Sequence, residues 1–254
     1  MPKIMKQEPT SANTNLKSKR DDFYNLFKNY PFSPEVDVLG NLPLFMRHQQ
    51  VAKLLCMHEL YKKIINVPGV IIEFGVRWGQ NLALFESFRT IYEPFNFTRK
   101  IIGFDTFEGF PSIHSKDGKD HIISKGSYGV SEKYEDTLDK VLKYHEEEAV
   151  LYNHIQKFEL IKGDATKTID DWLKKNNGKL ISFAYFDFDL YEPTKKCLEA
   201  IMPHLTKGSI VAFDEINHDN FPGETIALKE VVGTKTIQLQ RFQSNPFMAY
   251  FIVE

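Results

Sequence analysis

The fold is decided by the stretch Ile181-Ser-Phe-Ala-Tyr-Phe-Asp-Phe-Asp-Leu-Tyr-Glu-Pro-Thr194, which is followed by a helical segment and by Gly208-Ser-Ile-Val-Ala-Phe-Asp-Glu-Ile-Asn217. Each of the two parts contains a continuous apolar run, which predicts a buried strand of a parallel sheet. Each run ends in a pair of acidic residues. We therefore expect two strands of an α/β protein whose carboxyl ends carry charge.

The four acidic residues are Asp187 and Asp189 after the first strand, and Asp214 and Glu215 after the second. Ligands of an open parallel sheet bind outside the carboxyl ends of the strands, so neighbouring strands would bring these carboxylates to one ligand site. Crowded carboxylates repel each other and need a positive charge, for which a divalent cation is the simplest candidate. The alternative is that one or two of them only cap the helices that follow.

The composition limits the classes of protein to consider. The chain has 254 residues, 42% hydrophobic and 26% charged, which suits one large domain or one domain with appendages. A net charge of −2 offers no basic field to nucleic acid or an anionic membrane, and no apolar run could span a bilayer. The N-terminus lacks the apolar core of a signal peptide, and Cys56 and Cys197 stand outside any metal-ligand spacing. We expect a cytoplasmic protein with reduced thiols and neither a nucleic-acid nor a membrane partner.

Three regions follow one another along the chain. Residues 1–20 are polar and predict a mobile tail. Residues 21–66 contain apolar residues at helical spacing and predict helices, which would pack beside the site or at a dimer contact. Residues 67–254 alternate apolar runs with helical patterns and predict the main domain. Within it, the polar stretch 112–130 is too long for a plain connection, and we interpret it as a mobile flap over the site.

The first strand of the main domain runs from Val70 into a turn that contains Gly75 and Gly79, and a helix begins near Asn81. Glycines in such a turn let the backbone approach a ligand closely. The spacing is not the G-x-G-x-x-G of a nicotinamide fold, and a glycine turn alone is a weak signal.

Acids also end the next two strands. Asp105 closes the strand that begins at Lys100, where an acid commonly binds ribose hydroxyls; the alternative is that it caps a helix or turn. Asp164 follows the strand Phe158–Ile161, where it could bind a purine amino group or cap the next helix. At the C-terminus, Ser244-Asn-Pro246 separates two strand-like runs and predicts an antiparallel hairpin at the sheet edge.

Four motifs together resemble those of class I S-adenosylmethionine-dependent methyltransferases, and within that class the macrocin O-methyltransferase family of sugar O-methyltransferases. They are Glu73-Phe-Gly-Val-Arg-Trp-Gly79, Phe104-Asp-Thr-Phe-Glu-Gly-Phe-Pro111, Asp187-Phe-Asp-Leu-Tyr-Glu-Pro-Thr194 and Asp214-Glu215. The similarity covers the chain from Arg47 onward. It implies a Rossmann-like fold with a seven-stranded, mostly parallel sheet, an antiparallel last strand and helices on both faces.

The resemblance also implies roles for individual residues. The 73–79 turn would hold the methionine part of S-adenosylmethionine, Asp105 the ribose and Asp164 the adenine, and Asp189 would be the general base. Mg²⁺ would bind Asp187, Asp214 and Glu215. The cofactor-binding set as a whole would be Glu73, Phe74, Gly75, Arg77, Gly79, Asp105, Thr106, Phe107, Asp164 and Asp187.

The chain departs from the family at two positions, since Glu215 stands where the family has Asp and Gly163-Asp-Ala165 replaces its usual Gly-Trp-Phe. We predict a Mg²⁺-dependent O-methyltransferase that acts on a hydroxyl of a sugar or glycosylated small molecule and that forms a homo-oligomer, a dimer, as its relatives self-associate. The alternatives are a methyltransferase for catechol-like phenols and a non-catalytic S-adenosylmethionine-binding protein.

Overall fold

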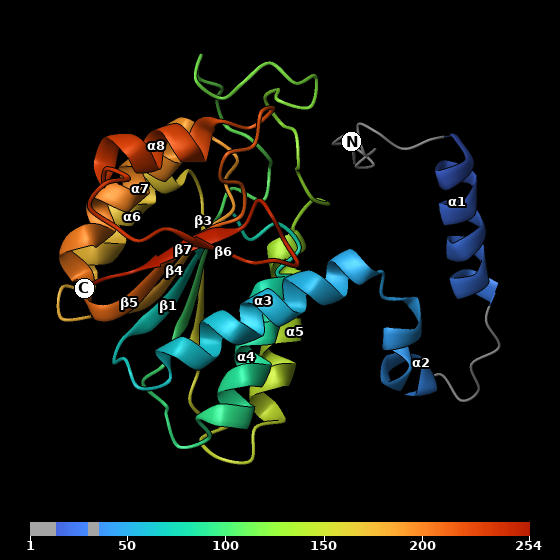
Figure 1. Cartoon of the computed structure of the whole chain (residues 1–254). Coiled ribbons are helices and arrows are strands. Elements are labelled where there is room, and N and C mark those ends of the chain that lie inside the picture. Colours follow the sequence, from blue (N-terminus) through green and yellow to red (C-terminus); the bar gives the residue numbers. More distant parts are fainter. Residues whose placement is uncertain (1–13, 30–35) are drawn as a thin grey trace.

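The computed structural model describes residues 14–29 and 36–254, and its centre is a seven-stranded sheet with the strand order β3-β2-β1-β4-β5-β7-β6 (Figure 1). The strands β1 to β5 are parallel, β7 is antiparallel to β5, and β6 is antiparallel to β7. The strands are β1 Val70–Phe74, β2 Ile101–Asp105, β3 Phe158–Lys162, β4 Ile181–Phe186, β5 Leu205–Phe213, β6 Gln240–Arg241 and β7 Ala249–Ile252. The predicted sheet and its terminal antiparallel hairpin are confirmed.

Helices cover both faces of the sheet (Figure 1). They are α3 His48–Ile64, α4 Gln80–Tyr92, α5 Tyr134–Glu147, α6 Ala165–Lys175, α7 Tyr191–Ile201 and α8 Gly223–Val231, with 3-10 turns η1 Leu42–Phe45 and η2 Met202–His204. One core lies between the sheet and α3, α4 and α5, and a second between the sheet and α6, α7 and α8. Successive strand residues serve opposite cores, as Ile71 and Ile72 do, because side chains alternate across a sheet.

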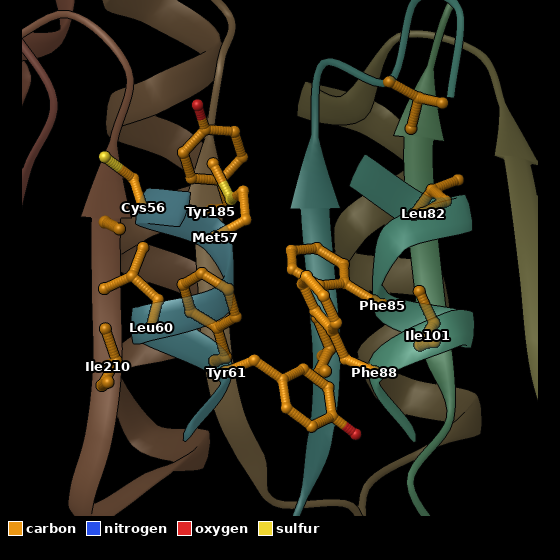
Figure 2. Packing of buried hydrophobic residues seen from close by; sticks show 14 of the residues in the cluster. Cys56, Met57, Leu60, Tyr61, Leu82, Phe85, Phe88, Ile101, Tyr185 and Ile210 are labelled. Atoms are coloured by element: carbon orange, nitrogen blue, oxygen red, sulfur yellow. The ribbon is translucent and has the colours of Figure 1, made fainter. Parts of the chain in front are cut away.

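The first core is dense and aromatic on the α3–α4 side. Figure 2 shows Met57, Leu60 and Tyr61 of α3 packed against β4 and β5, beside Phe85 of α4. The phenol group of Tyr61 donates a hydrogen bond to Glu93 at 2.6 Å. Helix α3 is therefore part of the folded core, and its first turn is fixed above the carboxyl ends of the strands.

Strands β4 and β5 are neighbours, as the sequence predicted, with Phe183 opposite Ile210 and Phe186 opposite Phe213. All six residues of β4 are buried, which explains why its sequence does not alternate between apolar and polar residues. The rings of Phe186 and Phe213 stack with centroids 5.2 Å apart. The two acidic segments therefore leave the sheet side by side.

The N-terminal region contains α1 Thr14–Asn29 and α2 Val36–Gly40. Helix α1 begins inside the range expected to be a tail, while residues 1–13 lie outside the described residues. The segment 112–130 contains no helix or strand, although the structure describes all of it. Its Asp117 is buried and accepts hydrogen bonds from the N–H groups of His114 and Tyr191, both at 2.6 Å, so one carboxylate fastens the segment to the start of α7. That the segment is a mobile flap stays a prediction. Among the described residues, no helix combines the length and the apolar character that crossing a membrane requires.

Arg99 is the largest fully buried side chain, and it joins the end of α3 to the start of β1. Its guanidinium donates to the carbonyl oxygens of Ile64, Val67 and Gly69 at 2.8–3.0 Å and forms an ion pair with Glu93 at 2.9 Å. Carbonyl groups at a helix end have no partner within the helix, and buried charges need one. One side chain thus satisfies both requirements.

We expect Arg99→Met to lower the free energy of unfolding by about 3–5 kcal/mol, because it leaves Glu93 and several carbonyl groups buried without their partner. Urea unfolding measures the change. Lys174→Ala, which breaks the exposed pair with Asp171 on α6, is the control and should leave the unfolding midpoint in place. Equal midpoints for wild type and Arg99→Met would contradict the assigned role of Arg99.

Candidate active site

A cavity of about 440 Å³ opens at the carboxyl ends of the strands. Its walls are the turns after β1, β2, β3, β4 and β5 and the start of α3. Most of the sequence-predicted site residues line it: Glu73, Gly75, Arg77, Asp105, Thr106, Asp164, Asp187, Asp189, Asp214 and Glu215. The structure therefore brings together in one cavity acids that were identified separately in the sequence.

Three predicted cofactor residues are not part of the cavity lining. Phe74 is a core residue whose ring stacks on Phe186 at 4.7 Å, and Phe107 packs in the other core. Gly79 precedes α4 with φ +77°, and a Cβ there would lie 2.3 Å from a side-chain carbon of Leu138. These residues shape the turns that form the cavity.

The turn after β1 lies directly against the turn after β4. A Cβ on Gly75 would come within 2.1 Å of the carbonyl oxygen of Asp187, so only glycine permits this approach. The next turn residue with a left-handed backbone is Arg77, at φ +48°, and its N–H donates to Asp105 at 2.7 Å. Asp105 also accepts from the N–H of Phe107 at 2.5 Å. The carboxylate of Asp105 thus fixes two cavity turns whether or not it also binds a ligand.

Side-chain atoms without a hydrogen-bond partner are concentrated in the cavity residues. Among the described residues, four buried side-chain polar atoms lack a partner, and three of them are Glu73 Oε2, Arg77 Nε and Glu215 Oε2. Buried polar groups are otherwise almost always paired, because an unpaired one costs about 1–3 kcal/mol. Three unpaired polar atoms at this place favour a polar ligand that supplies the missing partners.

The acids after β4 and β5 are held by a lysine from α3. The ammonium group of Lys53 lies 3.0 Å from Asp187 and 3.4 Å from Asp214. The hydroxyl of Tyr185 donates to Asp214 at 2.5 Å. The sequence required a positive charge at this point but did not identify Lys53, because α3 is distant in the chain and its orientation could not be derived from periodicity.

The pKa values in this cluster reflect burial and like charge. Burial and then the charge of Asp214 raise the pKa of Asp187, and Lys53 offsets this only in part. Burial and then the charges of Asp214 and Asp187 raise the pKa of Glu215. For Lys53, burial acts to lower the pKa, but Asp187 and Asp214 outweigh it and the pKa rises above its usual value. The cluster therefore favours the retention of positive charge and of protons.

Asp189 occupies a strained position at the cavity wall. Its φ is +61°, in the left-handed region, and 9% of its surface is exposed. Such a conformation is uncommon outside glycine, and strained residues cluster at functional sites. Burial, followed by the charges of Glu215 and Asp187, raises the pKa of the Asp189 carboxyl well above its ordinary value. A carboxylate with a raised pKa is a stronger proton acceptor.

A second residue that the sequence did not identify is Glu224, the second residue of α8, which is fully buried. It accepts hydrogen bonds from the N–H groups of Phe188, Asp189 and Glu215 at 3.0–3.2 Å. Its position in a helix after a polar loop gave no sequence signal.

Asp164 has the capping role that the sequence left open. It accepts hydrogen bonds from the N–H and the hydroxyl of Thr166 at 3.0 and 2.7 Å and so caps α6. Thr106 closes its own turn by a hydrogen bond from its hydroxyl to Gly109 at 2.7 Å. Both residues also line the cavity, so these local hydrogen bonds hold their polar groups at its edge.

The fit of a metal ion is mixed. The acids provide the oxygen ligands that Mg²⁺ prefers, and Glu215 Oε2 is buried without a partner. However, the ammonium of Lys53 lies between Asp187 and Asp214. Across residues 14–29 and 36–254, no three His, Cys, Asp or Glu side chains are grouped so that they could hold a metal ion.

Glu73 predicts a pH dependence of stability. Burial raises its pKa from 4.5 to about 8, although Asn81 donates to it. Between these pH values the folded state retains a proton that the unfolded state releases, so stability falls as the pH rises from about 4.5 to 8. We expect Glu73→Gln to remove this contribution, so that the melting temperature of the variant gains on the wild type as the pH increases.

Calorimetry of the ligand-free protein at pH 5 and pH 8 measures this gain. The exposed Glu132→Gln is the control for removal of a carboxylate. A difference in melting temperature between Glu73→Gln and wild type that is constant across this range would contradict the prediction.

Comparisons with known proteins identify the family of the chain. The macrocin-O-methyltransferase (TylF) family pattern matches residues 47–231. A crystal structure of CalS11, a calicheamicin methyltransferase, is similar with a TM-score of 0.91 and 41% identity, over 96% of this chain and 94% of that one. An apo structure of CalS11, described as a TDP-rhamnose 3'-O-methyltransferase of calicheamicin biosynthesis, gives a TM-score of 0.83 and 39% identity over 96% of both chains. The O-methyltransferase NovP shares the fold at 18% identity, with a TM-score of 0.61 over 80% of each chain. No curated protein matches the chain.

Proposed function

The chain belongs to the macrocin-O-methyltransferase family and is an S-adenosylmethionine-dependent O-methyltransferase, and we propose that it methylates a hydroxyl group of a sugar or of a glycosylated small molecule. The observation that carries this proposal is the convergence of Asp187, Asp189, Asp214 and Glu215 on one cavity that also contains unpaired polar atoms. The relatives support a sugar acceptor, since one CalS11 structure is described as acting on TDP-rhamnose.

The cofactor would bind along the turns after β1, β2 and β3. Glu73 Oε2 and Arg77 Nε are unpaired there: an ionised Glu73 would accept a hydrogen bond from the ammonium group of the cofactor, and Arg77 Nε would donate to its carboxylate. Asp105 and Asp164 stand at the ends of β2 and β3, in the order expected for ribose and base. When bound, S-adenosylmethionine supplies an electrophilic methyl group and leaves as S-adenosylhomocysteine.

The chain's own contribution is to bind the acceptor, orient it and remove its proton. We assign the general base to Asp189, whose carboxylate would take the proton from the acceptor hydroxyl as its oxygen bonds to the methyl carbon. Asp189 lines the cavity beside the other acids, and its strained backbone fixes the position of its carboxyl group there. The acceptor oxygen must also lie in line with the methyl group, so the walls of the cavity fix the geometry in which Asp189 works.

We expect Asp189→Asn to lower kcat by about 10²–10⁴-fold, because the amide cannot accept the hydroxyl proton. Turnover of TDP-rhamnose with S-adenosylmethionine measures the loss. The affinity for S-adenosylhomocysteine should stay within about twofold of wild type, because Asp189 is assigned to the acceptor and not to the cofactor. Asp171→Asn on the exposed face of α6 is the control.

Assays with sugar nucleotides and with catechols as acceptors decide between a sugar methyltransferase and the two alternatives. Methylation of a catechol and of no sugar nucleotide would replace the proposal with a phenol methyltransferase. Binding of S-adenosylhomocysteine without turnover of any acceptor would favour a non-catalytic cofactor-binding protein.

We further propose that Mg²⁺ binds at Asp187, Asp214 and Glu215, where it would supply charge stabilisation to the acceptor oxygen. The carboxylate ligands and the unpaired Glu215 Oε2 support this, whereas Lys53 occupies the space between two of the three acids. Metal binding would therefore require the Lys53 ammonium to move away.

We expect Lys53→Met to bind Mg²⁺ more tightly than the wild type, on the order of tenfold, because a competing cation is removed. Titration calorimetry of the protein with MgCl₂ measures this without any turnover, and Lys63→Met on the same helix is the control. Absence of Mg²⁺ binding in both proteins, together with turnover that EDTA leaves unchanged, would remove the metal from the proposal.

The proposal also includes self-association of the chain into a homo-oligomer. Large apolar side chains are exposed along the N-terminal region, with Leu26 62%, Leu39 72% and Leu44 57% exposed, which supports a dimer or a larger homo-oligomer. The cytoplasmic location and the absence of a nucleic-acid partner stay predictions from the composition.

A further inference from the structure

We infer that Glu224 is a positioning residue for methyl transfer: its carboxylate joins the turn that carries Asp189 to the turn that carries Asp214 and Glu215, and so sets the distance between base and acids across the cavity. The inference rests on the proposed function for its catalytic consequence. Its structural content, a clamp between two turns, stands on the contacts of Glu224 alone.

The contacts place one carboxylate between both acidic segments. Oε1 of Glu224 accepts from the N–H groups of Phe188 at 3.0 Å and Asp189 at 3.2 Å, both after β4. Oε2 accepts from the N–H of Glu215 at 3.2 Å, after β5. The two oxygens thus divide between the two segments.

These N–H groups need a partner because they lie just beyond the strand ladders. The last backbone hydrogen bonds between neighbouring strands run from the Asp187 N–H to the Phe74 carbonyl oxygen at 2.8 Å and from the Asp214 N–H to the Phe186 carbonyl oxygen at 2.9 Å. Past these points the segments leave the sheet, and a buried N–H without an acceptor is costly. Glu224 provides the acceptor where the sheet no longer does.

The start of α8 is built to lie this close to the turn of Asp189. A Cβ at Gly223 would come within 2.6 Å of the Tyr191 nitrogen and 2.8 Å of the Asp189 carbonyl oxygen. Only glycine allows that approach, and it brings the adjacent Glu224 to the turn. The strained backbone of Asp189, at φ +61°, is therefore held directly by the neighbouring helix.

The choice of a carboxylate at this point is informative. A fully buried Glu that interacts with the charges of four other acids is electrostatically unfavourable, and folding alone would favour a neutral residue. Three N–H groups on two sides require an acceptor on each oxygen, which a carboxylate has and a carboxamide lacks. The unfavourable burial of Glu224 is explained if the relative position of the two turns matters to the reaction.

The test compares Glu224→Gln and Glu224→Ala with the wild type in turnover of TDP-rhamnose, affinity for S-adenosylhomocysteine, melting temperature and crystal structure with S-adenosylhomocysteine. In Glu224→Gln the amide group faces the N–H of Glu215, two donors together, so the β5 turn should move while the β4 turn stays bound. We expect kcat to fall about 100-fold with KM and S-adenosylhomocysteine affinity within about threefold, as for a displacement near 1 Å.

Two controls separate positioning from mere stability. Lys229→Gln changes an exposed residue of α8, and Glu86→Gln removes a buried carboxylate from α4, where it pairs with Arg89 outside the cavity lining. Glu86→Gln should lower the melting temperature without a change of kcat in the folded protein. A lowered melting temperature with an unchanged kcat in Glu224→Gln, the result expected of Glu86→Gln, would overturn the inference.

The crystal structures decide the structural content independently of turnover. Displacement of residues 188–190 relative to 214–216 in the variants supports the clamp, and turns that superpose on the wild type refute it. If the wild type methylates no sugar acceptor, the proposed function fails, while this comparison still decides whether Glu224 positions the two turns.

Discussion

The structure depends on the concentration of like charge at the ends of two adjacent buried strands. Because β4 and β5 pair in register, Asp187 and Asp214 must leave the sheet together, in a region where burial amplifies every charge interaction. The fold accommodates this with a lysine from α3 and a tyrosine hydroxyl from β4. Neither of these devices neutralises the cluster completely. The remaining excess of negative charge favours a cation or a proton in the cavity.

The sequence predicted the parts of this arrangement that follow from local pattern. Continuous apolar runs identified β4 and β5, and the acids after them needed no tertiary information, since the ends of parallel strands meet at one edge. Lys53 could not be predicted in the same way. It belongs to an amphipathic helix more than a hundred residues away from Asp187, and helical periodicity indicates which face is buried but not which strand that face meets.

Glu224 and Arg99 mark a second limit of sequence reasoning. Both are charged residues whose surroundings in the sequence indicate exposure, yet both are fully buried because they satisfy backbone groups that secondary structure leaves unpaired. Such groups arise only where elements end and meet, and the meeting points depend on the whole topology. The local reading of Asp164 as a helix cap was available from the sequence, because a cap and its helix are adjacent in the chain.

Charge conservation within the cavity connects the cluster to the proposed reaction. Among the described residues, seven carboxyl groups and three cationic side chains line the cavity, so its field attracts positive charge. In the proposed reaction, methyl transfer would remove the positive charge of the sulfonium, and protonation of Asp189 would remove one negative charge from the same space. The two losses cancel, and the net charge of the cavity stays constant across the step. Burial and then the charge of Glu215 favour the protonated form of Asp189. The same crowding that strains the folded chain therefore offsets the loss of the sulfonium charge.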